Sequence, residues 1–205
     1  MENKNSQIQI TDPNYWDQRY LDDNTGWDMH QPSPPLKSYI DTLEDKNLRI
    51  LIPGCGNAHE ARYLLEKGFK NVTLIDFSKV VTDRLKEIYK ELPVQIINEN
   101  FFEHSGTYDI ILEQTFFCAL PHPLQEKHPK KCIELLNKNG RIAGVFFNKK
   151  FADTEPPYIR DTEEYKMIFS PYFDSLQFAD CKNSIAPRMG TELFFEFRKK
   201  ESLNS

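Results

Sequence analysis

Two glycines stand where a strand is expected to give way to a helix. They belong to the run Ile52-Pro53-Gly54-Cys55-Gly56-Asn57. Gly54 and Gly56 let the backbone approach a ligand closely, and the N–H groups that open the following helix point toward an anion. A pyrophosphate or a carboxylate group of a cofactor would suit this corner, although a tight turn with no ligand has the same composition.

An acidic residue about twenty positions further on strengthens the ligand interpretation. Asp76 falls at the end of the next expected strand, where a carboxylate accepts hydrogen bonds from both hydroxyls of a ribose. An aspartate there can also cap the next helix, but Ser78 competes for that position. His59 stands where a dinucleotide-binding loop has its third glycine, and no Gly-Lys-Ser or Gly-Lys-Thr follows. The pattern therefore favours a cofactor other than a dinucleotide or a nucleoside triphosphate.

A third group of side chains follows the third expected strand. Asn100 could meet the amino group of an adenine, and Phe101 could cover the face of the base. Phe102, the next residue, is expected to fill the core instead. These assignments predict an adenine pocket beside Asp76.

A fourth group follows the next strand, at the carboxyl edge where open α/β sheets bind ligands. We expect Glu113 to hydrogen-bond polar parts of the cofactor and Gln114 to line the reaction chamber. Phe116 and Phe117 fit the chamber wall and simple packing under the next helix equally well.

The elements that position these side chains follow from the hydrophobic pattern. From Leu48 to Gly140, short β-branched runs alternate with longer amphipathic stretches, which is typical of βαβ units with strands buried on both faces. The expected strands are 48–52, 71–75, 94–97, 109–112 and 141–147, and the expected helices are 57–67, 78–91 and 124–137, the last ending near Asn139-Gly140. Runs 175–178 and 192–198 are expected to add an antiparallel edge. The fold class is therefore α/β, with a seven-stranded, mostly parallel sheet, an antiparallel strand near the C-terminal end and helices on both faces.

The N-terminal part has a different pattern. Trp16, Trp27 and three prolines between Gln31 and Leu36 indicate a short helix followed by an irregular segment. We expect one domain over residues 1–205, with residues 1–47 as an N-terminal lid segment and residues 48–205 as the core.

Composition excludes several classes of function. The chain has 205 residues, 39% of them hydrophobic, and a formal net charge of −5, which argues against non-specific binding of nucleic acid. It contains no run of eighteen apolar residues, and its polar opening is unlike a signal peptide. We expect a cytoplasmic monomer that binds a small molecule, with no nucleic-acid or membrane partner.

Cysteine and histidine positions give no sign of a metal site. The cysteines are scattered and are expected to be free thiols, with Cys118 buried and inert in an apolar run: Cys55, Cys118, Cys132 and Cys181. His104, His122 and His128 have no metal-binding spacing and no carboxylate cluster beside them, so we expect them to face solvent.

Seven short pieces of the sequence resemble the thiopurine methyltransferase-like family, and most closely its plant thiol and halide methyltransferases. The pieces are Trp16 with Trp27-Asp28, Ile52-Pro53-Gly54-Cys55-Gly56, Asp76-Phe77-Ser78, Asn100-Phe101-Phe102, Phe116-Phe117-Cys118-Ala119, Pro156-Pro157-Tyr158 and Pro187-Arg188-Met189-Gly190. Together they span nearly the whole chain, and their order and spacing are jointly specific. The resemblance implies a Rossmann-like class I methyltransferase fold, S-adenosyl-L-methionine as the cofactor and methyl transfer to a small soft nucleophile.

The resemblance and the motifs together define the expected cofactor contacts. They are Trp16, Trp27, Gly54, Gly56, Asp76, Phe77, Asn100, Phe101, Glu113 and Gln114. The two tryptophans could hold the sulfonium by cation–π attraction, or anchor the N-terminal segment as ordinary packing residues. Asn100 stands where relatives often carry Asp, and Gln114 stands where thiopurine enzymes carry Arg and halide enzymes Tyr. These departures leave the acceptor open among a thiol, a thiopurine and a halide.

Methyl transfer depends more on in-line geometry than on acid–base groups. A thiol acceptor must still lose its proton, because the thiolate is the reactive form, and Tyr158 and Arg188 are the expected catalytic residues at that end of the pocket. A loop role for Tyr158 and surface ion pairing for Arg188 are alternatives. Two other functions share the glycine loop and Asp76: a small NAD(P)-binding oxidoreductase and a non-catalytic nucleotide-binding domain.

Overall fold

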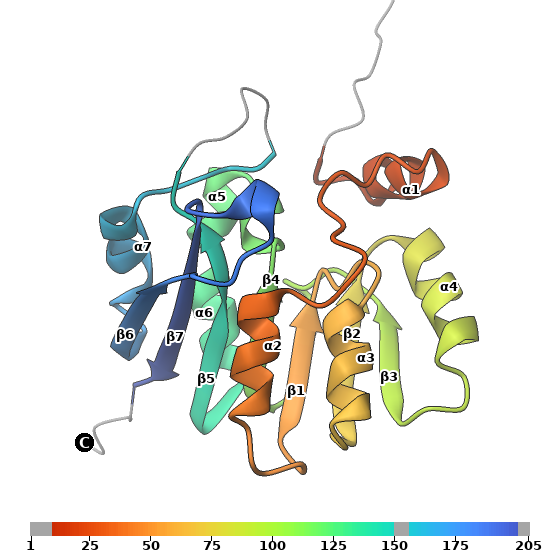
Figure 1. The fold of residues 1–205 in the computed structure, drawn as a ribbon, viewed down its shortest axis with the longest axis horizontal. Coiled ribbons are helices and arrows are strands. Elements are labelled where there is room, and N and C mark those ends of the chain that lie inside the picture. Colours follow the sequence, from red (N-terminus) through yellow and green to blue (C-terminus); the bar gives the residue numbers. More distant parts are fainter. Residues whose placement is uncertain (1–9, 150–155, 201–205) are drawn as a thin grey trace, which may run out of the picture.

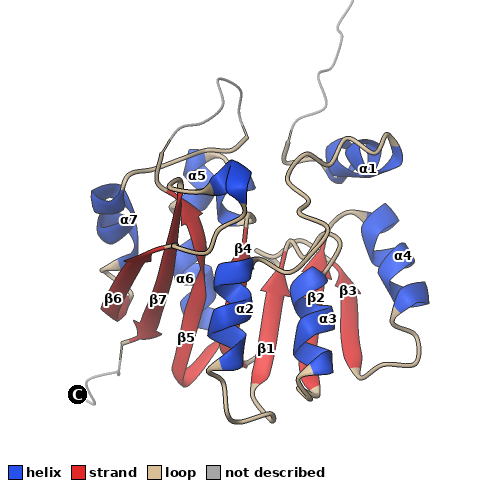
Figure 2. Ribbon diagram, viewed as in Figure 1, coloured by secondary structure: helices blue, strands red, loops and turns tan. Residues whose placement is uncertain are grey.

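The computed structural model describes residues 10–149 and 156–200 and has one seven-stranded sheet between two layers of helices (Figure 1, Figure 2). The strands are β1 (Arg49–Pro53), β2 (Asn71–Asp76), β3 (Val94–Asn98), β4 (Tyr108–Gln114), β5 (Leu136–Phe147), β6 (Phe173–Asp180) and β7 (Glu192–Lys199). The helices are α1 (Pro13–Leu21), α2 (Pro34–Asp41), α3 (His59–Glu66), α4 (Lys79–Ile88), α5 (His122–Gln125), α6 (His128–Leu135) and α7 (Thr162–Phe169), with 3₁₀ turns η1 (Phe117–Ala119) and η2 (Ala186–Arg188). The predicted α/β class with seven strands is confirmed.

Strand order places a crevice at one edge of the sheet. The order is β3-β2-β1-β4-β5-β7-β6, and β1 pairs in parallel with both β2 and β4. The connections therefore reverse direction between β1 and β4, and ligands of open α/β sheets bind outside the carboxyl ends of strands at such a point. β7 runs antiparallel to both β5 and β6, as the sequence predicted for the C-terminal part.

Alternate side chains of the central strands belong to two separate hydrophobic clusters, one on each face of the sheet. Ile50 and Ile52 of β1 belong to the cluster under α2, α3 and α4, whereas Leu51 belongs to the cluster under α6 and α7. Successive side chains of a strand point to opposite faces, so a strand covered on both sides must be apolar throughout. This requirement explains the unbroken apolar runs that identified the strands in the sequence.

The N-terminal part contains a helix where an irregular segment was expected. Pro34 and Pro35 lie in the first turn of α2, where a missing N–H group removes no intrahelical bond. Leu36 and Ile40 are fully buried, and α2 packs beside α3 against the sheet (Figure 1). The prolines thus begin a helix rather than prevent one.

The single helix expected over residues 124–137 is wrong. The chain forms α5 and then α6, because Pro129 has no N–H group to continue a helix from α5. β5 begins as early as Leu136, and a register shift against β4 accommodates Asn139-Gly140 inside the strand. α7 was not predicted.

Across residues 10–149 and 156–200, no helix has the length and apolar character needed to cross a membrane.

Candidate active site

A cavity of about 530 Å³ is lined by residues at the carboxyl ends of β1, β2, β3 and β4 and by residues of α1. Figure 1 shows α1 at this end of the strands. Eight of the residues predicted from the sequence line the cavity: Trp16, Trp27, Gly54, Asp76, Phe77, Asn100, Phe101 and Arg188. Gly56 and Gln114 line a smaller cavity of about 50 Å³, which shares Trp27, Gly54 and Thr115 with the large one. Glu113 and Tyr158 line neither cavity.

The glycine corner after β1 is required by close contacts as well as by backbone conformation. Gly54 and Gly56 have φ angles of +54° and +51°, in the left-handed region that disfavours side chains. A Cβ on Gly54 would lie 2.3 Å from the ring of Phe116, and one on Gly56 would lie 2.9 Å from the Tyr20 hydroxyl oxygen. Both positions therefore exclude any larger residue without movement of a cavity-lining ring.

Asp76 ties the end of β2 to this corner. Its Oδ2 accepts the N–H of Gly56 at 3.0 Å, and its Oδ1 accepts the N–H of Ser78 at 2.9 Å. A carboxylate has about four acceptor positions, and Asp76 lines the cavity, so it keeps capacity to accept a hydrogen bond from a ligand. Burial raises the pKa of Asp76 to about 6. Ser78 caps α4 through the N–H of Val81, as predicted.

The end of β4 is held by a buried acid. The Glu113 carboxylate is fully buried and accepts the N–H groups of Phe116 and Phe117 at 3.0 Å each. Burial raises its pKa to about 8. In the turn between Glu113 and Phe116, Thr115 has a φ of +57°, a conformation that costs a β-branched residue about 1–3 kcal/mol. Glu113 thus fixes a strained turn that carries two cavity-lining residues, Thr115 and Phe116.

Gln114 presents a side-chain amide without a protein partner. Both its Oε1 and its Nε2 are buried and make no hydrogen bond within the described part of the chain. Buried polar atoms are almost always satisfied, so the exceptions call for a ligand group or an ordered water. This amide borders the small cavity next to the glycine corner, where the charged amino-acid end of an adenosyl cofactor would need polar partners.

The N-terminal aromatics form one connected group over the cavity. Trp27 meets the rings of Trp16 and Tyr20 edge to face, with centroids 5.4 and 5.7 Å apart. The guanidinium of Arg19 lies over the Trp27 ring at 4.7 Å, so one face of this ring already holds a cation. Arg19 and Tyr20 line the cavity and were missed in the sequence, where nothing distinguishes them from other helix residues.

The residues predicted for the adenine pocket differ from expectation in one respect. Phe101 is buried and stacks on His128 with centroids 5.3 Å apart, whereas Phe102 is half-buried and lines the cavity. Both rings line the cavity, and Phe102 also packs against the core cluster, so the expected core role of Phe102 holds only in part. Asn100 is exposed at the rim, and its Oδ1 accepts the Phe102 N–H at 3.0 Å.

Two of the three histidines are buried, contrary to the prediction that they face solvent. His128 is fully buried under the aromatic rings, and burial lowers its pKa to about 3. His104 lies between Glu99 and the hydroxyl of Tyr108, while His122 is exposed as expected. The described residues contain no group of three metal ligands.

The buried cysteines agree with the sequence interpretation. All four are free thiols, and burial raises the pKa of Cys118 well above its ordinary value. Cys118 lines the cavity as an unreactive wall residue.

The two predicted catalytic residues have different surroundings. Arg188 lines the cavity, donates to the Trp27 carbonyl oxygen at 2.6 Å and pairs with Glu192 at 3.3 Å. Tyr158 donates its N–H to the Cys118 carbonyl at 2.7 Å, and its ring contacts that of His122. Arg188 can therefore contact a ligand directly. Tyr158 does not line the cavity, but it contacts or neighbours two residues that do, Cys118 and Pro157.

The fold and the site together define the class of the protein. A sheet with one antiparallel strand between β5 and β6, a glycine corner after β1 and an acid at the end of β2 are the features of a class I methyltransferase that uses S-adenosyl-L-methionine. The orphaned amide of Gln114, the carboxylate of Asp76 and the aromatic wall fit that cofactor.

The chain belongs to the thiopurine S-methyltransferase family, whose sequence model matches residues 11–200. It is 25% identical to the Arabidopsis thaliana protein named Probable thiol methyltransferase 2, over 93% of this chain and 87% of that one. It is 23% identical to thiopurine S-methyltransferase of Acinetobacter baylyi, over 78% and 84%. The 1,6-didemethyltoxoflavin-N1-methyltransferase of Burkholderia thailandensis, solved with S-adenosylhomocysteine (SAH), superposes with a TM-score of 0.74 at 15% identity, covering 98% and 92%, and shows the shared fold. The oxidoreductase alternative finds no support.

Proposed function

We propose that the protein methylates the sulfur of a small thiol. The observation that carries this proposal is the composition of the cavity wall contributed by the segments after β4, around the end of β5 and in η2. Besides the cations Lys127 and Arg188, these segments contribute mainly uncharged lining residues: Cys118, Ala119, Leu120, Pro121, Leu124, Phe147, Pro156, Pro157 and Pro187. Among the described lining residues, the carboxylates are Asp76 and Glu99 alone, at the ends of β2 and β3.

A wall of this kind suits an acceptor that needs little help to lose its proton. A thiol ionises near pH 8.5, whereas a hydroxyl group or an ammonium needs a strong base at neutral pH. The Arg188 guanidinium borders the same space and would stabilise the thiolate, with the thiol proton released to water. Tyr158 would act from behind this wall by fixing the chain next to Cys118.

The cofactor side is assigned to the remaining predicted residues. Bound S-adenosyl-L-methionine supplies an electrophilic methyl group on a positively charged sulfur. Asp76 would accept the ribose hydroxyls, with Phe77 beside it, while Asn100 and Phe101 would border the adenine. Gln114 would bind the amino-acid end of the cofactor near the glycines. Trp16 would face the sulfonium, and so would the face of the Trp27 ring that Arg19 does not cover. Glu113 would contribute indirectly by holding the turn of Phe116.

Names of similar proteins support a soft nucleophile. Thiol, thiocyanate and thiopurine methyltransferases are among the relatives, and a halide acceptor belongs to the same chemical series. We further propose that the protein works as a monomer in the cytoplasm on small molecules, without nucleic acid. Its four free cysteines support a reducing compartment, and its net charge of −5 disfavours binding to phosphates.

A labelled-methyl screen tests the proposal. Purified protein with methyl-labelled S-adenosyl-L-methionine is incubated separately with benzenethiol, hydrosulfide, iodide and benzylamine. We expect labelled thioether from benzenethiol, labelled methanethiol from hydrosulfide, slower transfer to iodide and none to the amine. Arg188→Met should raise the pH at which thiol turnover is half-maximal. Transfer to the amine but to no thiol would refute the proposed acceptor.

A further inference from the structure

One acidic side chain of α1 reaches across to another helix. Asp17 accepts, on its Oδ1, the hydroxyl of Ser78 at 2.5 Å and the N–H of Val80 at 3.1 Å. Ser78 is the cap of α4 and Val80 lies in its first turn. Figure 1 shows α1 lying across the start of α4, and the two helices are in contact.

These two bonds are unlike the other side-chain hydrogen bonds of α1. In the described part of the chain, those of Trp16, Gln18 and Arg19 go to partners within residues 10–24. Among these four residues, Asp17 alone forms side-chain hydrogen bonds that join α1 to the core beyond residue 48. The first N–H groups of a helix have no intrahelical partners, and a carboxylate there is favoured by the helix dipole.

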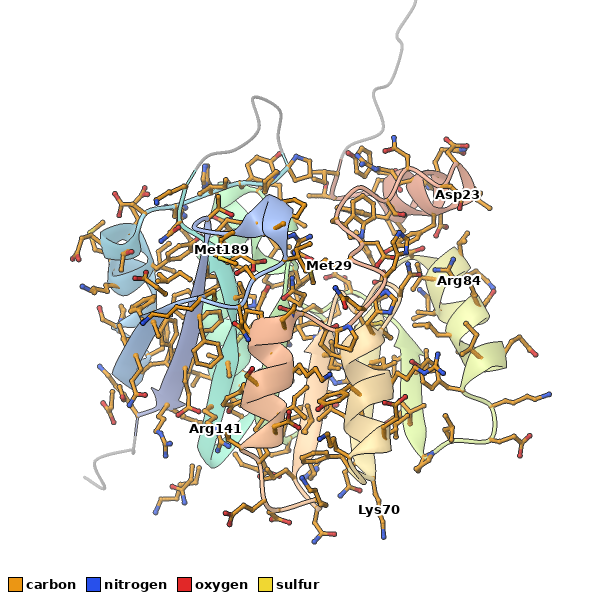
Figure 3. The ribbon with its side chains drawn as sticks, in the orientation of Figure 1. Asp23, Met29, Lys70, Arg84, Arg141 and Met189 are labelled. Carbon is orange, nitrogen blue, oxygen red and sulfur yellow. The ribbon has the colours of Figure 1, made fainter. Side chains whose placement is uncertain are left out.

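The neighbours of Asp17 on the helix face the cavity. Trp16 and Tyr20 line it, and the Tyr20 hydroxyl lies at the glycine corner next to Gly56. Arg84 of α4 covers the Tyr20 ring at 5.6 Å, and Figure 3 shows Arg84 on the side of the molecule where the chain leaves α1 at Asp23. The positions of both rings therefore depend on how α1 is seated on α4.

We propose that Asp17 is a positioning residue that docks α1 on the N-terminus of α4 and thereby sets the affinity for the cofactor. Its role rests on the proposed cofactor contacts of the N-terminal segment. Only molecules with α1 seated have the complete binding wall, so the apparent dissociation constant rises as the seated fraction falls. Loss of a capping carboxylate lowers the equilibrium constant for seating by about tenfold, and this factor is the largest loss of affinity that the substitution causes.

Tryptophan fluorescence gives a readout that is independent of turnover. The chain has two tryptophans, Trp16 and Trp27, and both belong to the N-terminal segment. We would compare Asp17→Ala and Asp17→Asn with Asp22→Ala, a control on the same segment whose carboxylate accepts a hydrogen bond from Gln18 alone among residues 10–149 and 156–200. Each variant is measured by SAH calorimetry, emission spectrum and thermal unfolding.

We expect Asp17→Ala to bind SAH about three- to tenfold more weakly and to emit at longer wavelength, with a thermal midpoint close to that of the wild type. Asp17→Asn should stay within about threefold of the wild type, because its amide oxygen accepts the same two bonds. Asp22→Ala should match the wild type. Unchanged SAH affinity together with unchanged emission in Asp17→Ala would overturn the proposal. Losses of SAH affinity in Asp17→Asn and Asp22→Ala as large as the loss in Asp17→Ala would also overturn it. A wild-type protein that binds no SAH would instead overturn the cofactor site.

Discussion

Replacing Gly54 with alanine should displace the Phe116 ring from the cavity wall. An added Cβ would lie 2.3 Å from Phe116 Cδ2 and 2.9 Å from its Cγ. Non-bonded carbons prefer about 3.5–4.0 Å, so the ring must retreat by more than about 1 Å. The new methyl group also meets the left-handed backbone at this position, where φ is +54°.

The expected cost follows from these two effects. A side chain in the left-handed region costs about 1–2 kcal/mol, and overpacking adds about 1–3 kcal/mol. Gly54→Ala should therefore lower the free energy of unfolding by about 2–5 kcal/mol. Its affinity for SAH should fall by at least about tenfold, since 1.4 kcal/mol of lost binding already has this effect.

Gly68 provides a matched control. Its φ is +87°, and a Cβ there would meet nothing within 4 Å, so Gly68→Ala carries the backbone cost alone. Urea unfolding and SAH calorimetry are compared for both variants and for Gly54→Ala with Phe116→Ala, which removes the clashing ring. We expect normal SAH affinity in Gly68→Ala and a smaller effect of Gly54→Ala in the Phe116→Ala background. If Gly54→Ala were as stable as Gly68→Ala and bound SAH normally, the described contact between corner and ring would be wrong.

Three further substitutions test the ionisable groups. Because the pKa of Asp76 is about 6, SAH affinity should fall about tenfold per pH unit below that value, since the protonated acid accepts fewer ribose hydrogen bonds. Calorimetry on Asp76→Asn should show weak SAH binding that does not change with pH in this range. A pH dependence retained in this variant would contradict the assignment. Burial raises the pKa of Glu113 to about 8, so the folded state holds its proton more tightly than the unfolded state and wild-type stability should fall between about pH 5 and 9. Urea unfolding of Glu113→Gln should lack this component. Arg188→Met leaves Glu192 buried without its partner and should lower the free energy of unfolding by about 3–5 kcal/mol. Adding Glu192→Met should restore most of this stability. A double variant as unstable as Arg188→Met would argue against the pairing.

The sequence predicted the parts of the site that local signals specify. β-branched runs identified β1 and β2, and the spacing between them placed Gly56 and Asp76 at the same edge of the sheet, where they form a 3.0 Å hydrogen bond. Ser78 was recognised as a cap because its hydroxyl acts within one turn. These features depend on neighbours close in the chain.

Other features depend on contacts that the sequence does not display. Prolines before Leu36 suggested an irregular segment, but burial of this side chain against the core determines a helix. Phe101 and Phe102 both line the cavity, although only Phe101 was expected to, because a loop has no fixed period to tell which ring faces the core. Arg19 and Asp17 gained roles only once α1 was placed on α4.

A crystal structure of the protein with SAH tests the central claim most directly. The ligand should lie in the cavity between the glycine corner and Phe101, with its ribose hydroxyls donating to Asp76 and its amino-acid end within hydrogen-bonding distance of Gln114. A ligand bound elsewhere, or one whose ribose makes no contact with Asp76, would contradict the cofactor site described for this fold.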